Sequence, residues 1–347
     1  MPRTVILSAA RTPIGKLGGG LSTLPATHLG GVAIREALNR ADVAPEQVEH
    51  VVMGTVLQAG QGQIPSRQAQ IEAGIPIEVT SETINKVCAS SVRAVGMIDQ
   101  AVRAGDLDVA VAGGMESMSQ SPYLLPGARQ GFRMGDMKTL DSMIQDGLRN
   151  PFSGKQMFEE ATEVGDELEM TRADLDRWAL RSHERAVAAT DEGRMADEIV
   201  PVTIHGRKGD TVVEVDEAPR RGSTLEALAT IVAQAAVADE FAWLARTPAN
   251  AALKALDKAG LQPGDIDLWE INEAFASVTL NSARMLGLDE DKVNVNGGAV
   301  ALGHPIGASG ARILGSLVLE LRRRGGGYGC AAICSGGGQG DAVIVHV

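Results

Sequence analysis

Cys88 is the residue of this chain whose type and position first suggest chemistry. It lies in the segment N-K-V-C-A-S-S at 85–91, directly before an amphipathic stretch at 92–104 that predicts a helix. Backbone N–H groups at a helix N-terminus and the positive end of the helix dipole both favour a thiolate, which is the nucleophilic form of cysteine. The alternative is that Cys88 is a small buried apolar side chain, as most single cysteines are.

Two further segments carry groups that could act with such a thiol. Asn272 follows a short apolar strand, where its amide could position a water or polarise a carbonyl, or could instead cap the next helix. His304 lies in a loop dense in glycine, between a glycine and a proline. A histidine with an ordinary pKa of about 6.5 is a suitable acceptor for a thiol proton, so we expect His304 to be held for chemistry.

A second thiol, Cys334, ends an apolar run that leads into the turn S-G-G-G-Q-G at 335–340, which contains Gly336. A metal site here would need two more ligands at suitable spacing, and none is visible, so we expect no metal. A phosphate-binding loop would need a following helix with lysine, and a final strand follows instead. A thiol beside exposed backbone N–H groups remains, and this is typical of an acid–base cysteine next to an oxyanion hole.

The composition of the chain excludes several classes of protein. The 347 residues carry a formal net charge of −12, which argues against nucleic acid as the main partner. No apolar run is long enough to span a membrane. The three cysteines do not form a disulfide framework and suit a reducing compartment. We therefore expect a cytoplasmic protein that binds neither nucleic acid nor membrane.

Short apolar runs alternate with helical patterns in the first and last thirds of the chain, which predicts an α/β fold with helices packed on sheets. The repeated order suggests an internal duplication, although there is no strict sequence period. The middle, from Ser117 to about Ala229, has weaker apolar runs and is interpreted as an inserted lid or binding subdomain. The expected strands are Val5–Leu7, Val48–Gly54, Val109–Gly113, Leu268–Glu270, Gly329–Cys334 and the pair Glu198–His205 and Thr211–Val215; the expected helices are Thr27–Arg40, Ile64–Ala73, Val92–Ala104, Ala173–Glu192, Ala249–Lys258, Ala276–Gly287 and Gly310–Arg324.

Taken together, these segments resemble the thiolase family. The resemblance is specific because the segments are separate and occur in the family's order over both ends of the chain and most of the middle. They are R-T-P-I-G-K at 11–16, N-K-V-C-A-S at 85–90, G-G-M-E-S-M-S at 113–119, N-E-A-F-A at 272–276, G-G-A-V-A-L-G-H-P-I-G-A-S-G at 297–310 and C-S-G-G-G at 334–338.

The resemblance implies a thiolase fold, with two similar βαβαβαββ halves in a five-layered α-β-α-β-α core and an inserted loop domain. It places the first half at 1–117, a CoA-binding loop domain at 118–229 and the second half at 230–347. It implies a homodimer or homotetramer. The implied activity is Claisen condensation of two acyl-CoA molecules, such as acetyl-CoA to acetoacetyl-CoA, or the reverse thiolysis of a 3-ketoacyl-CoA. Coenzyme A is then a substrate, and no cofactor is implied.

The same resemblance implies a role for each site residue. Cys88 would become acylated, and His304 would take its proton. Cys334 would remove the α-proton of the second acyl-CoA, or protonate the leaving carbanion in thiolysis. Asn272 would hold a water that forms one oxyanion hole with His304, and the N–H groups of Cys88 and Gly336 would form a second hole. The residues expected along CoA and the acyl group are Leu148, Gln156, Met157, Arg220 and Phe275.

The chain departs from the family pattern at one point. Between Ala229 and Thr230 the resemblance predicts about 45 further residues, including the last strand of the first half, whose loss would leave an unpaired sheet edge. Either the chain lacks this segment or the printed sequence omits it, and the loss of an element that both halves should share favours omission. Thr230–Gln234 is expected to open the second half. Gln156 also departs, because short-chain biosynthetic members commonly carry histidine there.

Two other functions remain open from the sequence. One is another condensing enzyme of the same superfamily, such as an acyl-carrier-protein synthase, and Cys334 together with the Asn272 segment argues against it. The other is a non-catalytic CoA-binding or scaffold protein, which the missing segment makes conceivable. Acylation of Cys88 by an acyl-CoA would separate this last function from the other two, a thiolase and another condensing enzyme.

Overall fold

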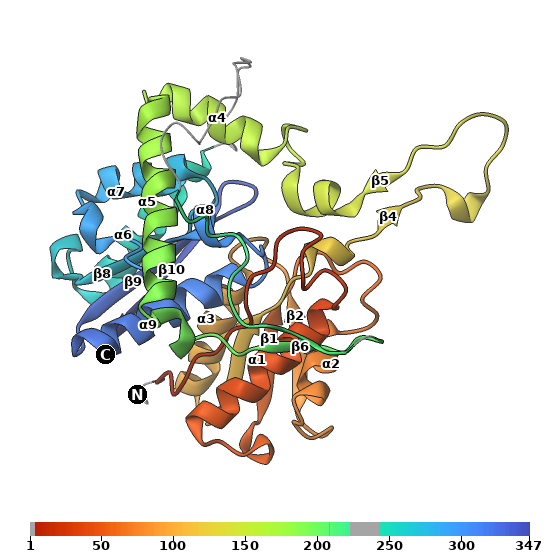
Figure 1. Ribbon diagram of the computed structural model, residues 1–347, viewed down its shortest axis with the longest axis horizontal. Helices are drawn as coiled ribbons and strands as arrows, with labels where there is room; N and C mark the ends of the chain where they lie inside the picture. Colours follow the sequence, from red (N-terminus) through yellow and green to blue (C-terminus); the bar gives the residue numbers. More distant parts are fainter. Residues whose placement is uncertain (1–3, 208, 223–242) are drawn as a thin grey trace.

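The first half of the protein is built on a parallel sheet of three strands in the order β2-β1-β3 (Figure 1). The computed structural model describes residues 4–207, 209–222 and 243–347. Side chains alternate across the central strand β1 (His50–Gly54). Val51 and Met53 pack in one apolar cluster with α1 and α2, whereas Val52 packs in another with α3. The other elements are β2 (Thr80–Ile84), β3 (Ala110–Gly114), α1 (Ala26–Ala41), α2 (Pro65–Glu72) and α3 (Ser90–Ala104).

The second half repeats this plan around the sheet β10-β9-β8. Leucines and isoleucines of α9 pack on one face of β9, and α6 and α7 pack on the other face. β8 and β9 are parallel, β9 and β10 form an antiparallel hairpin, and Val293 bridges to the far edge of β8 in parallel. The bounds are α6 (Thr247–Ala259), β8 (Leu268–Ile271), α7 (Ala276–Leu286), α9 (Ser309–Arg324), β9 (Tyr328–Ser335) and β10 (Gln339–His346).

The two halves meet through α3 and α9, which lie against each other between the two sheets (Figure 1). The layers are therefore α1 and α2, the first sheet, α3 and α9, the second sheet, and α6 with α7. This confirms the expected five-layered α-β-α-β-α core. It also confirms the duplication, because β1, α2, α3 and β3 of the first half correspond in order and pairing to β8, α7, α9 and β9 of the second.

The segment between the halves carries its own elements. β4 (Tyr123–Leu124) and β5 (Leu140–Asp141) pair at the base of an arm that projects from the body of the molecule (Figure 1). A π-helical turn at Met143–Leu148 leads on to two helices, α4 (Met157–Glu167) and α5 (Arg172–Asp191). The predicted strand pair is confirmed as β6 (Val202–Ile204) and β7 (Thr211–Val213).

One expected strand is wrong. Residues 4–10 form no strand, and Val5 and Leu7 are 70% and 54% exposed. The segment is held from one side by Arg322 of α9, which donates to the carbonyls of Ile6 and Leu7. A strand needs a neighbouring strand for its backbone groups, and the described residues supply none beside it. The other predicted strands and helices correspond to observed elements within a few residues. The predicted strand at Thr230–Gln234 and the boundary at 229–230 lie outside the described residues.

None of the described helices is long and apolar enough to cross a membrane.

Candidate active site

Cys88 lies in a short connection between β2 and α3 that is fixed at several points. The hydroxyl of Ser90 accepts from the backbone N–H of Lys86 and donates to the carbonyl of Val87, and Ser335 of β9 donates to the carbonyl of Lys86. Val87 has a φ of 45°, an unusual value for a β-branched residue that indicates strain at the turn. The connection therefore holds Cys88 in one place, 2% exposed, between the two halves.

The surroundings of Cys88 correct one expectation from the sequence. The pKa of Cys88 is raised to about 12, mainly by burial and also by the charge of Glu116, although the N–H groups of Cys88 and Gly336 oppose the rise. The thiol is therefore neutral at neutral pH. The prediction of a thiolate at a helix mouth is wrong because desolvation of the sulfur outweighs the favourable backbone dipoles. Cys88 needs a base to become a nucleophile.

His304 has one ring nitrogen engaged and one free. Its Nδ1 lies 2.6 Å from the hydroxyl of Ser309, which also lies 2.9 Å from the carbonyl of Pro305. A carbonyl can only accept, so the hydroxyl donates to Pro305 and accepts from Nδ1–H. This assigns the proton to Nδ1 and leaves a lone pair on Nε2, which is buried and has no hydrogen-bond partner among the described residues.

The charge state of His304 suits this arrangement. The pKa of His304 is lowered to about 4, mainly by burial and also by the positive charge of Arg312. The ordinary pKa expected from the sequence is therefore wrong, again because desolvation penalises the charged form. The ring is a neutral base throughout the physiological pH range. Ile306, two residues on, packs in the same apolar cluster as Cys88, so the loop of His304 lies beside the loop of Cys88.

Cys334 ends the buried strand β9 and is fully buried. Burial raises the pKa of Cys334, and the nearby charge of Cys88 raises it further. The backbone N–H of Gly336, in the turn after Cys334, lowers the pKa of Cys88, so this turn also lies beside the first thiol. The two thiols therefore belong to one site, and a negative charge on either one disfavours a charge on the other.

Asn272 follows β8 and its side chain is fully buried. The capping alternative is wrong, because α7 begins at Ala276 with Phe275 as its N-cap. Both amide atoms of Asn272 lack a hydrogen-bond partner in the described structure. Leaving a buried polar atom unpaired costs about 1–3 kcal/mol, so Asn272 and the Nε2 of His304 point to a polar ligand that pairs with them.

Glu116 connects the loop of His304 to the first half of the protein. Its motif was not predicted to have this role. Its buried carboxylate accepts from the N–H groups of Val56, Leu57 and Gly307 and from the hydroxyl of Thr55, at 3.0–3.2 Å. A Cβ at Gly307 would lie 2.8 Å from this carboxylate, so glycine is required there. The available signal was the match at 113–119, which contains Glu116 but gives no partner for it.

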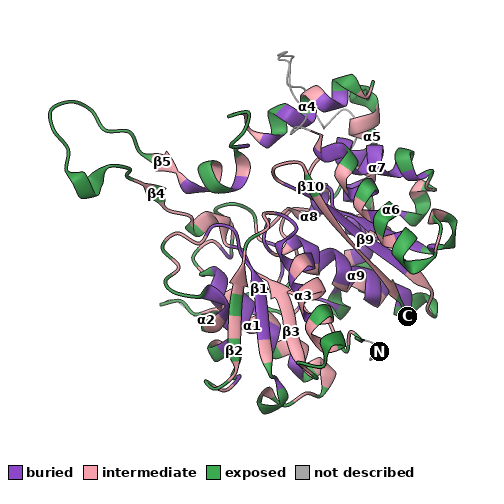
Figure 2. Cartoon of the chain, turned by 180° about the vertical axis from the view of Figure 1, so that it is seen from behind, coloured by how far each residue is buried: buried purple, intermediate pink, exposed green. Residues whose placement is uncertain are grey.

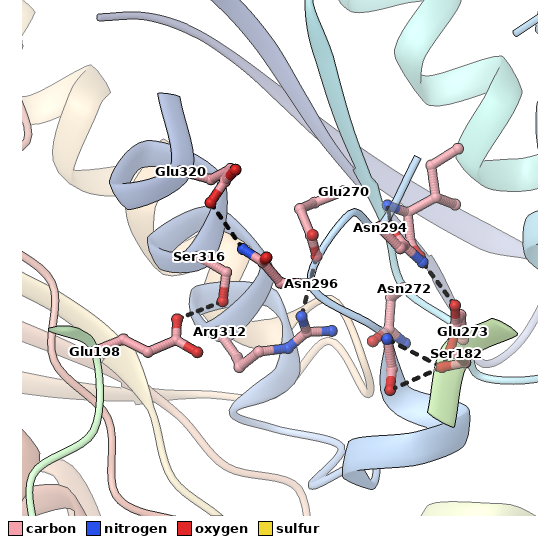
Figure 3. A network of polar contacts seen from close by, with 12 residues as sticks. Ser182, Glu198, Glu270, Asn272, Glu273, Asn294, Asn296, Arg312, Ser316 and Glu320 are labelled. Atoms are coloured by element: carbon pink, nitrogen blue, oxygen red, sulfur yellow. Dashed lines mark hydrogen bonds and ion pairs between the residues drawn. The ribbon is translucent and has the colours of Figure 1, made fainter. Parts of the chain in front are cut away.

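A buried ion pair lies on the other side of the loop. Arg312 of α9 donates to Glu270 of β8 at 3.0 Å, and the two side chains are 6% and 4% exposed (Figure 3). Burial raises the pKa of Glu270 to about 8, although the charge of Arg312 opposes this rise. Figure 3 also shows Ser316, one turn further along α9, which donates to Glu198 at 2.6 Å. These contacts fix the start of α9, and with it Ser309.

The five residues expected along CoA and the acyl group lie in different surroundings. Met157 and Phe275 pack in the same apolar cluster as Cys334. Leu148 and His304 line one cavity. Gln156 is the half-buried N-cap of α4, and Arg220 is exposed, with its backbone N–H donating to His183. Met157 and Phe275 therefore lie near Cys334, Leu148 lines the same cavity as His304, and Arg220 stays at the surface.

Comparison with known proteins agrees with this geometry. The thiolase N-terminal domain matches residues 4–236, and the thiolase C-terminal domain matches residues 225–347. The chain belongs to the thiolase family. This membership and the two thiols of one site argue against the acyl-carrier-protein synthase alternative.

Several curated thiolases are similar along their whole length. A probable acetyl-CoA acetyltransferase of Mycolicibacterium smegmatis is 44% identical, with 99% of this chain and 100% of the relative covered. The acetyl-CoA acetyltransferases of Cupriavidus necator and Pseudomonas aeruginosa are 44% and 41% identical, with at least 99% of each chain covered. The alignment with the C. necator thiolase extends over 391 positions, which is about 44 more than the 347 residues of this chain.

The lowered pKa of His304 predicts how stability depends on pH. The unfolded chain binds a proton on this residue below about pH 6.5, whereas the folded protein does so only below about pH 4. Stability is therefore fully present above pH 6.5 and falls as the pH drops toward 4, by an amount on the order of 3 kcal/mol from this group. The free energy of unfolding, measured with urea between pH 7 and pH 4.5, should fall less steeply for His304→Asn than for the wild type. An equal fall in both proteins would contradict the lowered pKa of His304.

Ser309→Ala tests the role of the hydroxyl beside His304. Without its acceptor, Nδ1–H loses a buried hydrogen bond of about 1–2 kcal/mol, and the proton can move to Nε2. Alkylation of Cys88 by iodoacetamide should slow about 5- to 30-fold, because fewer molecules keep the basic lone pair on Nε2. The ¹⁵N shifts of the imidazole should report the mixed tautomer. Ser282→Ala removes a buried hydroxyl of α7 that donates to the carbonyl of Val278, and this matched control should change neither the alkylation rate nor the ¹⁵N shifts. An unchanged tautomer in Ser309→Ala would refute the role.

Proposed function

We propose that this protein is an acetyl-CoA acetyltransferase of the thiolase type, which condenses two acetyl-CoA molecules to acetoacetyl-CoA and catalyses the reverse thiolysis. One observation carries the proposal. Two buried thiols lie close to each other, and the described residues also hold a neutral imidazole whose free nitrogen is buried and a buried amide without a partner. Relatives of full-length similarity that carry the name acetyl-CoA acetyltransferase support the choice of substrate.

In the first half-reaction Cys88 becomes acetylated. The proton of its thiol moves to Nε2 of His304 as the sulfur attacks the thioester carbonyl, and the bond from that carbonyl to the CoA sulfur breaks. The proton on His304 then goes to the departing CoA thiolate. The buried thiol and imidazole are both neutral before the step, and the products, an acetyl thioester and free CoA, are neutral again at these atoms. A dry site suits this cycle, because charge is present only transiently.

In the second half-reaction a carbon nucleophile replaces the sulfur. The proton of the Cys334 thiol first moves to Nε2 of His304, which is free again after the first half-reaction. The Cys334 thiolate then takes the α-proton of a second acetyl-CoA, and the resulting carbanion attacks the carbonyl of acetyl-Cys88. A C–C bond forms, the bond from the carbonyl to the Cys88 sulfur breaks, and the Cys88 thiolate takes the proton held on His304. A negative charge on one thiol disfavours a charge on the other. This favours acylation before carbanion formation, because Cys334 loses its proton only while Cys88 is neutral as a thioester.

Two sets of donors are available for the oxygens that become negative. The N–H groups of Cys88 and Gly336 already act on the Cys88 sulfur, which is where the acyl carbonyl would be attached. Asn272, through a water, and His304 would stabilise the enolate oxygen of the second acetyl-CoA. Losing one such donor typically reduces the rate about 10²- to 10³-fold. Coenzyme A acts as a substrate in both steps, and we propose no further cofactor.

Met157, Phe275 and Trp243 pack in the cluster around Cys334 and would limit the length of the acyl group. Leu148 would contact the pantetheine arm, Gln156 would line the acyl side, and the exposed Arg220 would meet the nucleotide end of CoA. We place the protein in the cytoplasm, since all three cysteines are free thiols, as a reducing compartment would keep them.

We also propose a homotetramer assembled through the projecting arm between β4 and β5. The arm exposes several large apolar side chains, including Phe132, Met134 and Met137, and Figure 2 shows it exposed over nearly its whole length. Apolar side chains gathered on an exposed segment are typical of an interface between protein chains. A homodimer is the alternative if the arm remains free.

Acyl trapping tests the proposed reaction. Incubation of the wild type with acetyl-CoA should yield acetoacetyl-CoA. Cys334→Ala should accumulate a protein heavier by one acetyl group on Cys88 and release no product, because acylation proceeds and carbanion formation does not. Cys88→Ala should show neither. Intact mass, measured in the same samples, also verifies the 36.2 kDa of the 347-residue chain. A wild type that never acylates would overturn the proposal and favour a non-catalytic CoA-binding protein.

Replacement of the arm methionines tests the assembly. Light scattering of the wild type should give the mass of four chains, and Met134→Ser with Met137→Ser should shift the protein to dimers, because the arm loses apolar area that only an interface would bury. Leu253→Ser removes an exposed apolar side chain of α6, outside the arm, and should leave the mass unchanged. A double variant that stays tetrameric would exclude the arm as the interface.

A further inference from the structure

Glu273 carries a buried carboxylate that takes no part in the reaction steps proposed above. It is 2% exposed and accepts four hydrogen bonds from three separate segments of the chain. The donors are the indole N–H of Trp178 at 3.0 Å and the hydroxyl of Ser182 at 2.7 Å, both on α5, the side-chain amide of Asn294 at 2.9 Å and the backbone N–H of Val300 at 3.0 Å (Figure 3). A buried carboxylate with four donors is held in one position.

One oxygen of this carboxylate, Oε1, is connected to the end of strand β8. It accepts from Trp178 and from Asn294. The side chain of Asn294 also binds both backbone groups of Ile271, because it accepts from the N–H and donates to the carbonyl at 2.8 Å each. Trp178, Glu273 and Asn294 therefore form a chain of hydrogen bonds that ends on the residue before Asn272.

The other oxygen, Oε2, is connected to the loop of His304. It accepts from the hydroxyl of Ser182 and from the N–H of Val300, in the short helix α8 (Ala299–Leu302) that ends two residues before His304. This loop is also held by Glu116. The two oxygens thus bind different parts of the site, and a change at Oε1 leaves the contacts of the His304 loop in place.

The amide of Asn272 needs such support, because neither of its atoms has a partner among the described residues. Its backbone N–H donates to the carbonyl of Ala332 in β9 at 2.9 Å, so the sheet fixes the chain before the side chain. After Asn272 the chain leaves the sheet, and Glu273 is the first residue outside it. The direction of the free amide therefore depends on the backbone at 271–273, which Asn294 and Glu273 hold from both sides.

We propose, on the basis of the function proposed above, that Glu273 is a positioning residue of the second half-reaction. It holds the amide of Asn272 in the direction that stabilises the enolate of the second acetyl-CoA, and Trp178 fixes Glu273 from helix α5 of the segment between the halves. Acetylation of Cys88 relies on other donors, its own N–H and that of Gly336. The contact from Trp178 is therefore needed for C–C bond formation and not for acetylation.

The test separates the two half-reactions in Trp178→Phe, which removes the indole N–H and leaves the other three donors of Glu273. Condensation of acetyl-CoA should slow about 10- to 100-fold, because a slightly misdirected amide stabilises the enolate poorly. Acetylation, followed by intact mass in a Cys334→Ala background that stops at the acetyl-enzyme, should keep its rate. Trp269→Phe makes the same exchange in the same apolar cluster, retains all four donors and should change neither rate. Equal slowing of both half-reactions in Trp178→Phe would overturn the inference.

A double-mutant cycle shows whether the effect passes through Asn272. Asn272→Ala should slow condensation about 10²- to 10³-fold. Adding Trp178→Phe to it should cause no further loss, because the group that Glu273 positions is then gone. Circular dichroism verifies folding, and Glu273→Gln replaces Trp178→Phe in the cycle if the latter does not fold.

The cycle also separates this inference from the function on which it rests. Additive losses in an enzyme that forms acetoacetyl-CoA would overturn the role of Glu273 and leave the proposed function standing. A wild type that forms no acetoacetyl-CoA would overturn the proposed function, and the role of Glu273 with it.

Discussion

The buried carboxylate of Glu116 is the contact on which the geometry of the site depends. It accepts from three donors on the loop after β1 and from one donor on the loop of His304, and so joins the two halves of a duplicated fold at a single point. Burial raises the pKa of Glu116, and only the four donors make its charged form tolerable there. The halves are also joined by the packing of α3 on α9 and by the hydrogen bond from Ser335 to the carbonyl of Lys86, so Glu116 does not hold them together alone. Its own contribution is to the loop of His304. Because Cys88 comes from one half and His304 from the other, the contact with Gly307 fixes the imidazole relative to the thiol.

Desolvation is the second constraint, and it sets the protonation states of the site. It raises the pKa of both thiols, lowers that of His304, and outweighs the backbone dipoles around Cys88. A site of neutral groups is inert toward solvent and becomes reactive only when a substrate supplies an electrophilic carbonyl and pairs with Asn272 and the free nitrogen of His304. The cost of those unpaired atoms is then part of the free energy that ligand binding recovers.

Much of the site could be predicted from the sequence, because its motifs name the reacting atoms directly. The structure buries Cys88, Cys334, Asn272 and the free Nε2 of His304, and their catalytic roles stay predictions. The supporting contacts could not be predicted, since each joins residues far apart in the chain. Glu116 reaches Gly307 across 191 positions, and Arg312 reaches Glu270 across 42. The pKa values could not be predicted either, because position next to a helix indicates the dipole but not the degree of burial. Val5–Leu7 has the composition of a strand, but composition cannot supply the neighbour that a strand requires.

The lack of strand structure at Val5–Leu7 and the unpaired edge of β3 in the described residues have the same cause. In the second half, β9 is completed on one edge by β8 and on the other by β10, and helices cover both faces. In the first half the equivalent of β10 is absent from the described residues, so β3 stays half-buried and the N-terminal segment lies across a cavity from it. The loops that carry Cys88 and His304 are not affected, because other elements hold them. Cys88 depends on β2, α3 and Ser335 of β9, and His304 depends on Glu116 and the start of α9. The pairing order of the sheet therefore separates the loops that hold Cys88 and His304 from the outer edge of β3, which has no neighbouring strand among the described residues.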